Sequence, residues 1–211
     1  FTILLIGWCV FLVYAYPGQV TLDSIDQLTE ARAGYYTDSH PAMMAALWRI
    51  VDWFVAGPFG MIIIQSATFL AGFYLVLRRA MQPRHAAIAA VLVFFFPPVL
   101  TPMSVVWKDC VMAGFLSLGC GLLLEQSRWL RIAGLVSLGL GASVRYNALA
   151  ATLPVIVILF TWRHHPLHLA PTLRGRIQRY AISSGAWIAV TLATFGVNGA
   201  LTDREMYIWH S

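Results

Sequence analysis

The chain has 211 residues, of which 59% are hydrophobic and only 11% are charged. Soluble domains are about half apolar and about a quarter charged, so the composition excludes an ordinary soluble domain. The net charge of +5 comes from arginines and one lysine, Lys108, which are scattered between apolar runs and do not cluster with aromatic residues. This pattern argues against nucleic acid as a partner and indicates contacts with membrane lipids.

Apolar runs of membrane length recur along the whole chain, which predicts an all-α, multi-pass transmembrane helical bundle. At roughly 20 residues per span, we expect about seven spans. Their ranges are Phe1–Tyr16, Pro58–Leu77, His85–Leu100, Lys108–Leu124, Leu130–Ser143, Ala148–Trp162 and Tyr180–Leu201. The chain begins inside an apolar run and stops soon after another. We therefore expect residues 1–211 to be a single membrane domain and a fragment of a longer chain.

The arginines between these runs predict how the bundle is oriented. With seven spans, the arginines at 78, 79 and 84, at 128 and 131, and from 163 to 179 all fall on one side. The positive-inside rule identifies that side as the cytoplasm. The opposite, outer side then holds residues 17–57, the turn at 107–109, the corner at Arg145 and residues 203–205. Every carboxylate except Glu125 falls on the outer side.

The first outer loop, residues 17–57, is predicted to carry juxtamembrane helices. Its second part, Pro41–Val55, is apolar but contains Arg49 and Asp52. If this part crossed the membrane, the arginine loops would change sides and lose their bias. We therefore predict an amphipathic helix that lies at the outer interface, with Trp48 and Trp53 at the depth where tryptophan is enriched.

The first part of the same loop, Pro17–His40, holds four of the nine carboxylates of the chain. Asp23, Asp26 and Glu30 are spaced i, i+3 and i+7, so they share one face of a helix. Such a row can bind a divalent cation, or one member can act as a general base. The alternative is a solvated face of a helix in a loop.

Four more polar residues are candidates for the same outer surface. Asp38 and His40 belong to a turn that precedes the interfacial helix, where His40 binds a metal ion, donates to a phosphate or caps the helix. Lys108 faces an anion such as a lipid phosphate, or it is an interfacial anchor. Arg145 holds a phosphate, or it pairs with Asp109 or another outer carboxylate.

The order of these motifs resembles that of a known family. A first span is followed by PGQVTLDSIDQL, YYTDSHPAMMAALWRI, SVVWKD and SVRYNALAATLP. This order is similar to that of the GT-C superfamily of membrane glycosyltransferases, in particular the bacterial enzymes related to protein mannosyltransferases and lipid A sugar transferases. The resemblance covers most of the chain and corresponds to the N-terminal membrane portion of such an enzyme.

The resemblance implies transfer of a sugar from a polyprenyl-phosphate donor to a lipid, polysaccharide or protein acceptor. The reaction is expected at the outer, periplasmic face of the bacterial inner (plasma) membrane. Asp23, with Asp26 as the alternate, would activate the acceptor hydroxyl or contribute to a divalent-cation site. His40-Pro41-Ala42 would correspond to a His-Pro-Pro stretch of the family. Lys108 and Arg145 would hold the donor phosphate, and Glu30 and Asp38 complete the expected substrate site.

Two other classes of function remain open at this point. A membrane transporter or lipid flippase would need ionisable residues near the middle of the bilayer. A non-catalytic membrane scaffold would use the acidic surface to bind a partner. Because the charged residues of this chain cluster at the outer rim, the sequence favours the enzyme.

Overall fold

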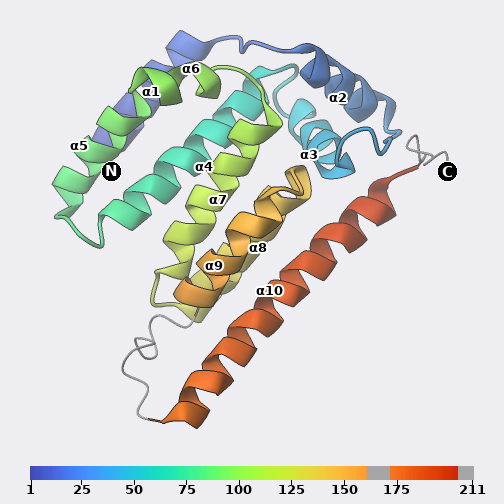
Figure 1. Ribbon diagram of the computed structural model, residues 1–211. Helices are drawn as coiled ribbons and strands as arrows, with labels where there is room; N and C mark the ends of the chain where they lie inside the picture. The colour runs from blue at the N-terminus through green and yellow to red at the C-terminus, as the bar shows by residue number, and fades with distance from the viewer. Residues whose placement is uncertain (161–171, 204–211) are drawn as a thin grey trace.

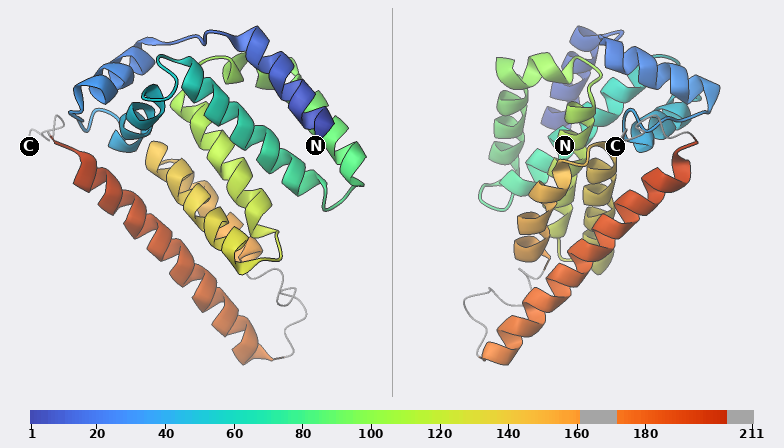
Figure 2. Two further views of the ribbon diagram at one scale, coloured as in Figure 1. Left: turned by 180° about the vertical axis from the view of Figure 1, so that it is seen from behind. Right: turned by 45° about the vertical axis from the view of Figure 1, so that its right-hand side comes forward.

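The computed structural model describes residues 1–160 and 172–203, apart from the side chain of residue 176. Within these ranges the chain forms ten α-helices and no β-strand, which confirms the all-α prediction. The helices are α1 (Thr2–Ala15), α2 (Leu22–Ala33), α3 (Ala42–Asp52), α4 (Phe59–Leu77), α5 (Pro83–Phe94), α6 (Pro97–Met103), α7 (Lys108–Leu123), α8 (Arg128–Val144), α9 (Ala148–Leu159) and α10 (Leu173–Leu201). Most of them run side by side, and α2 and α3 lie across one end of the bundle (Figures 1 and 2).

The two ends of the bundle differ in charge, as the arginine pattern predicted. One end, called here the acidic end, carries α2, α3, the start of α7, the corner at Arg145 and the end of α10 (Figure 1). At the opposite end, Glu125 forms ion pairs with Arg78 and, at 2.9 Å, with Arg79. Residues 161–171 and 204–211, which include part of the predicted inner loop and of the outer segment 203–205, lie outside the described residues.

Fewer helices reach membrane length than the sequence predicted. Two helices in the described residues, α4 and α10, are long and apolar enough to cross a bilayer. A third span results if α5 and α6 count as one, although they meet at a bend of 71°. The helices α1, α7, α8 and α9 have 12 to 17 residues. At 1.5 Å per residue they are about 18 to 26 Å long, short of the roughly 30 Å hydrocarbon core.

Glycines let helix α7 pack closely between α4 and α8. A Cβ atom added at Gly72 of α4 would lie only 2.1 Å from the backbone carbon of Ser117 in α7. On the other side of α7, the backbones of Gly119 and Gly134 approach each other in the same way. Small residues at such crossings allow helix backbones to touch, which is how helices associate in an apolar solvent.

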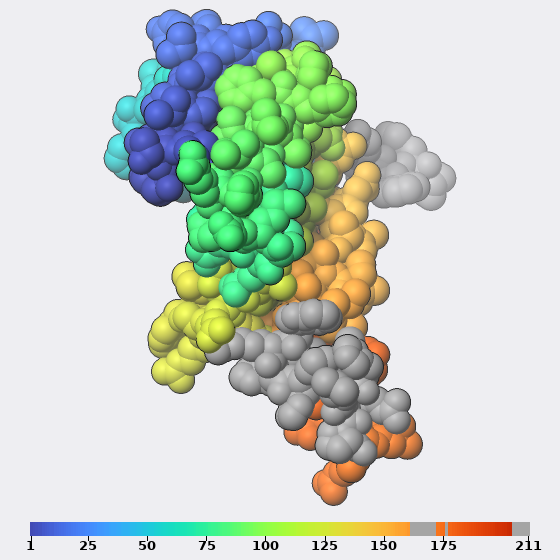
Figure 3. All heavy atoms as spheres, turned by 90° about the vertical axis from the view of Figure 1, so that its left-hand side faces the viewer, coloured from blue at the N-terminus to red at the C-terminus, as the bar shows by residue number. Residues whose placement is uncertain are grey.

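Aromatic and aliphatic side chains complete the packing at the first helix. Helix α1 packs against α4 and α5, and Phe11 of α1 meets Phe94 of α5 edge to face with ring centres 4.7 Å apart. Figure 3 shows the residues of α1 beside those of α5 along this side of the molecule. Phe11, Phe94 and Met61 are fully buried, so the core of the described residues extends across several helices.

Helix α3 forms where the sequence predicted an amphipathic helix, but one of its tryptophans is not interfacial. Trp48 is fully buried and its indole N–H donates to the carbonyl of Gly57 at 3.1 Å. Trp53 is 79% exposed and does occupy a surface position. The prediction for Trp48 is wrong because α3 turns its apolar face, which includes Met44 and Trp48, inward against the bundle.

Asp52 ties the end of α3 to the end of α2. Its carboxylate accepts hydrogen bonds from Nε of Arg32 at 3.0 Å and Nη2 at 3.2 Å, and from the backbone N–H of Gly57 at 2.6 Å. The hydrogen bond from Arg32 lowers the pKa of Asp52 below its ordinary value of 3.8, against the opposing effect of partial burial. The two contacts from Arg32 join α2 to α3 at the acidic end, and the contact from Gly57 closes the turn after α3.

The close approach at Gly72 predicts a specific loss of stability. We expect Gly72→Ala to lower the free energy of unfolding by about 1–3 kcal/mol, because the backbones of α4 and α7 must separate. The matched control is Gly185→Ala in α10, where an added Cβ meets nothing within 4 Å. Replacing that helical glycine should leave stability unchanged or raise it by up to about 1 kcal/mol. Thermal unfolding in detergent measures both, and equal effects would contradict close packing at Gly72.

The lowered pKa of Asp52 predicts a loss of stability in acid. A carboxyl group with a lowered folded-state pKa stabilises the fold above its unfolded-state value and loses this effect as the pH falls through the folded-state pKa. We therefore expect Asp52→Asn to lower the unfolding temperature at pH 7. The difference from wild type should shrink as the pH falls below 3.8. A difference that is constant from pH 7 to pH 3 would show that the charge of Asp52 does not contribute.

Candidate functional site

A short backbone pairing brings the start of α2 next to the start of α7. Gln19 and Val105 form a parallel β-bridge, in which the N–H of Gln19 donates to Ser104 at 3.2 Å and the N–H of Val106 donates to Gln19 at 2.9 Å. The hydroxyl of Ser24 also donates to the carbonyl of Val106. Because α2 and α7 both begin within three residues of this bridge, their first turns are neighbours.

The pairing places Asp23 against Lys108. The Nζ atom of Lys108 lies 3.3 Å from Oδ2 of Asp23 and 3.1 Å from Nδ1 of His40. An ammonium group can only donate, so Nδ1 of His40 accepts and the ring proton lies on Nε2. That Nε2 atom lies 4.0 Å from Oδ2 of Asp23. The three side chains thus form a cluster from three separate parts of the chain.

Lys108 is held within this cluster and does not extend to the surface as an anchor. Its side chain is only 19% exposed, whereas that of Asp23 is 58% exposed. A lysine at the first position of an apolar helix is costly unless it finds a partner. The structure pairs Lys108 with the Asp23 carboxylate, a partner that the sequence analysis did not name, and the contact with a lipid phosphate stays a prediction.

Arg145 forms an ion pair with Asp109, which is one of the two alternatives that the sequence left open. Nη1 of Arg145 donates to Oδ2 of Asp109. The neighbours Lys108 and Asp109 therefore point to different partners, as adjacent residues on a helix must. Arg145 follows the last residue of α8 and has an extended backbone, so the corner between α8 and α9 brings it to α7.

These residues surround a polar pocket of about 340 Å³ at the acidic end. Its lining consists of Asp23, Ser24, Gln27, Trp107, Lys108, Asp109 and Arg145. The two carboxylates and two cations in this lining balance each other. The pocket therefore offers both acceptors and donors of hydrogen bonds without a net charge. Three of the predicted site residues, Asp23, Lys108 and Arg145, line it, and His40 contacts it through Lys108.

The three carboxylates of the predicted row all lie on α2, but only Asp23 lines the pocket. Asp26 is exposed on α2 and does not line the pocket. Glu30 accepts hydrogen bonds from the backbone N–H of Thr37 at 3.3 Å and from the Thr37 hydroxyl, so it holds the turn after α2. Asp38 is near Tyr146, whose pKa is raised by burial and by the Asp38 charge.

The side chains at this end do not fit a metal ion. In the part of the chain that the structure describes, no group of three or more His, Cys, Asp and Glu side chains could hold one. The cation nearest to Asp23 is the Lys108 ammonium. The predicted contribution of Asp23 to a divalent-cation site therefore has no supporting ligand set among these residues.

Asn198 of α10 holds the two sides of the acidic end together. Its side-chain oxygen accepts from the backbone N–H of Met43 in α3 at 3.0 Å, and its Nδ2 donates to the carbonyl of Ser143 in α8 at 3.0 Å. Met43 lies three residues after His40 and Ser143 two residues before Arg145. A single buried amide thus relates the His40 turn to the Arg145 corner.

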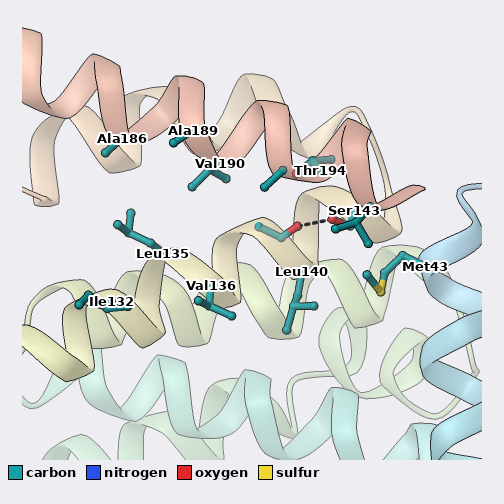
Figure 4. A pocket seen from close by; sticks show the side chains of 13 residues that line it. Met43, Ile132, Leu135, Val136, Leu140, Ser143, Ala186, Ala189, Val190 and Thr194 are labelled. Atoms are coloured by element: carbon teal, nitrogen blue, oxygen red, sulfur yellow. Dashed lines mark hydrogen bonds between the residues drawn. The ribbon is translucent and has the colours of Figure 1, made fainter. Parts of the chain in front are cut away.

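An apolar groove of about 380 Å³ runs between α8 and α10. Figure 4 shows side chains such as Leu135 and Leu140 of α8 facing those of α10, including Val190. Met43, Ser143 and Thr194 lie at the end of the groove nearest the acidic end. Ser143, at that end of the groove, is two residues before Arg145 of the polar pocket in the chain.

Sequence reasoning missed three residues of the pocket lining, Ser24, Gln27 and Trp107, and named Asp109 only as a partner of Arg145. Gln27 lies four residues after Asp23, so it is on the same side of α2. A search for polar residues at i+4 from each carboxylate would have included it. The exposed position of Trp107 depends on the turn before α7, for which the sequence carries no comparable signal.

No protein-family model matches this chain, and neither the curated proteins nor the solved structures contain a match to it.

The exposure of Asp23 predicts that its ion pair contributes little to stability. Ion pairs with a largely exposed partner are typically worth about 0–1 kcal/mol. We therefore expect Asp23→Asn and Lys108→Gln each to change the free energy of unfolding by less than about 1 kcal/mol. Thermal unfolding in detergent measures this change. A much larger loss in either variant would show that the cluster is a structural support and would contradict a functional role.

Proposed function

We propose that this protein is a GT-C type glycosyltransferase that moves a sugar from a polyprenyl-phosphate donor to an acceptor hydroxyl. The observation that carries the proposal is the polar pocket lined by Asp23, Lys108 and Arg145, at the end of an apolar bundle. This pocket combines a largely exposed carboxylate with two cations. A general base and a pair of phosphate-binding groups are what transfer from a lipid-linked sugar requires.

The proposal places the pocket at the outer face of the bacterial inner membrane. In it, about seven segments cross the bilayer, with the shorter helices α1, α7, α8 and α9 crossing beside α4, α10 and the bent pair of α5 and α6. The difference in charge between the bundle ends supports this topology, because Arg78, Arg79 and Arg128 lie at the end opposite the pocket. By the positive-inside rule the arginine-rich end faces the cytoplasm.

In the proposed reaction the acceptor oxygen attacks the anomeric carbon of the sugar. The new bond joins the acceptor oxygen to that carbon, and the bond from the carbon to the phosphate oxygen breaks. The leaving polyprenyl phosphate takes the electron pair of the broken bond. Asp23 takes the proton of the acceptor hydroxyl. The Lys108 ammonium lies 3.3 Å from this carboxylate.

Lys108 and Arg145 would hold the donor phosphate. The ion pair with Asp109 engages Nη1 of Arg145, and a guanidinium has five N–H donors, so the remaining ones can bind phosphate oxygens. The charge that develops on the phosphate as the sugar leaves is stabilised by these two cations. The donor must compete with Asp23 for Lys108, so binding of the phosphate would also release the Asp23 carboxylate for its role as base.

The polyprenyl tail would lie in the apolar groove between α8 and α10. The groove is lined almost wholly by apolar side chains and ends near Ser143, two residues from Arg145. A phosphate held by Arg145 could therefore have its lipid tail in the groove. A transporter or flippase is less well supported, because the charged residues lie in α2, α3, the loops and the ends of the apolar helices.

The exposed carboxylates of α2 give the direct test of this proposal. We expect Asp23→Asn to lower the rate of sugar transfer about 10²–10⁴-fold, because an amide cannot accept the proton. Asp26→Asn should have a much smaller effect, since Asp26 does not line the pocket. The rate is measured as loss of labelled sugar from polyprenyl-phosphate donors, in membranes that contain the full-length protein.

Three outcomes of this comparison decide the assignment. Loss of transfer with Asp23→Asn, at normal expression and membrane insertion, supports Asp23 as the base. The reverse order of effects would assign the role to Asp26. Unchanged transfer in both variants would remove the α2 carboxylates from the mechanism.

A further inference from the structure

We propose that Gln27 determines which sugar the pocket accepts, by forming a hydrogen bond with one hydroxyl group of the bound sugar. This inference rests on the proposed function. It assigns a residue to the recognition of the sugar, which is the part of the donor that differs from one substrate to another. Gln27 belongs to the pocket lining, and its Nε2 atom forms no hydrogen bond with another described residue.

The first observation is an unsatisfied amide. Gln27 is 2% exposed, and its Nε2 atom has no hydrogen-bond partner among the described residues. Burying an amide without a partner costs free energy, so buried side-chain polar atoms are nearly always paired. A protein retains such a group where a ligand supplies the missing partner. The wall of a polar pocket is the place where a ligand can do so.

The second observation is that the Ser24 hydroxyl and the two cations of the lining each already contact another protein group, although both cations keep further N–H donors. The hydroxyl of Ser24 donates to the carbonyl of Val106. Lys108 contacts Asp23 and His40, and Arg145 contacts Asp109. Gln27 therefore supplies a neutral donor that no protein group uses. Rotation about its last side-chain torsion, which is broad and roughly two-fold, exchanges the amide oxygen and nitrogen, so Gln27 can donate to a hydroxyl or accept from it.

The third observation is the chemistry of the pocket as a whole. Its two carboxylates and two cations balance, which favours a neutral, hydroxyl-rich ligand part over a second anion. Trp107, which is 43% exposed, adds an aromatic face at the same wall. The C–H face of a sugar ring is apolar and packs on such a face, while its hydroxyls reach the polar side chains.

Position along α2 connects Gln27 to the reaction. Gln27 is four residues after Asp23, and side chains at this spacing are neighbours about 5–6 Å apart at Cβ. A sugar whose anomeric carbon lies near an acceptor activated by Asp23 can therefore reach Gln27 with a hydroxyl. Gln27 would select the sugar, and Asp23 would perform the proton transfer.

The first test is the stability of the protein without substrate. Methionine has similar length and high helix propensity but no amide. Because the amide of Gln27 is unpaired, Gln27→Met should raise the unfolding temperature of the substrate-free protein by about 2–4 °C. The matched control is Gln65→Met, because Nε2 of Gln65 donates to the carbonyls of Met103 at 2.9 Å and Val105 at 2.8 Å. That substitution should lower the unfolding temperature.

The second test is binding to full-length protein in detergent. The probes are farnesyl phosphate alone and farnesyl phosphate linked to mannose, glucose or galactose. We expect one linked sugar to raise the unfolding temperature of the wild type more than farnesyl phosphate does. Gln27→Met should lose this additional rise and keep the rise caused by farnesyl phosphate. The affinity of Gln27→Met for the preferred linked sugar should fall about tenfold, because one hydrogen bond to the sugar is lost. It should then equal the affinity of the wild type for an analogue of that linked sugar without the recognised hydroxyl.

The results separate this inference from the proposed function. A lower unfolding temperature for substrate-free Gln27→Met would show a structural amide and overturn the inference. If Gln27→Met loses the rise in unfolding temperature caused by farnesyl phosphate as well as the additional rise caused by the sugar, Gln27 binds the phosphate. If its preference among the linked sugars is unchanged, Gln27 does not recognise the sugar. Each of these outcomes leaves the transferase proposal standing. If wild type responds to farnesyl phosphate but no sugar adds to the response, both proposals fail.

Discussion

The arrangement of the acidic end depends on one short backbone pairing, between Gln19 and Val105, that lies outside every helix. Gln65 of α4 reinforces it, because its amide donates to the carbonyls of Met103 and Val105 in the segment before α7. In an apolar bundle, backbone groups outside helices must find partners, and here they find one another and a buried glutamine. The consequence is that α2 and α7 begin side by side. This pairing, together with the hydrogen bond from Ser24 to Val106, brings together Asp23 and Lys108, which are 85 residues apart in the chain.

The helices below this end supply the rigidity that the site needs. Helix α7 is fixed between α4 and α8 by backbone contacts at glycines, so its first turn, which carries Lys108 and Asp109, has little freedom to move. Asn198 adds a connection from α10 to both α3 and α8. The charged residues of the pocket are thus carried by packed helix ends, and a site built on such elements is held more precisely than one on loops.

Where sequence reasoning failed, tertiary packing overrode a local pattern. The i, i+3, i+7 spacing of Asp23, Asp26 and Glu30 does place them on one side of α2. Their partners, however, come from different elements: Lys108 contacts Asp23 and Thr37 contacts Glu30, while Asp26 faces solvent. Trp48 was expected at the membrane interface and is instead in the core, since aromatic residues suit both environments equally well. The number of spans was also hard to predict, because it depends on where the chain bends and each helix ends. Between α5 and α6, for example, the chain bends by 71°.

The sequence by itself determined the all-α class, the amphipathic helix after His40, and the separation of arginines from most carboxylates at opposite ends. These features follow from hydrophobic periodicity and charge, which are local or additive properties of the chain. Only the tertiary structure decided that Lys108 contacts Asp23 and His40, that Arg145 pairs with Asp109, and that the amide of Gln27 is buried at the same pocket without a partner. Such contacts join residues far apart in sequence, and the packing of many helices, which no local pattern encodes, selects among the partners that chemistry allows.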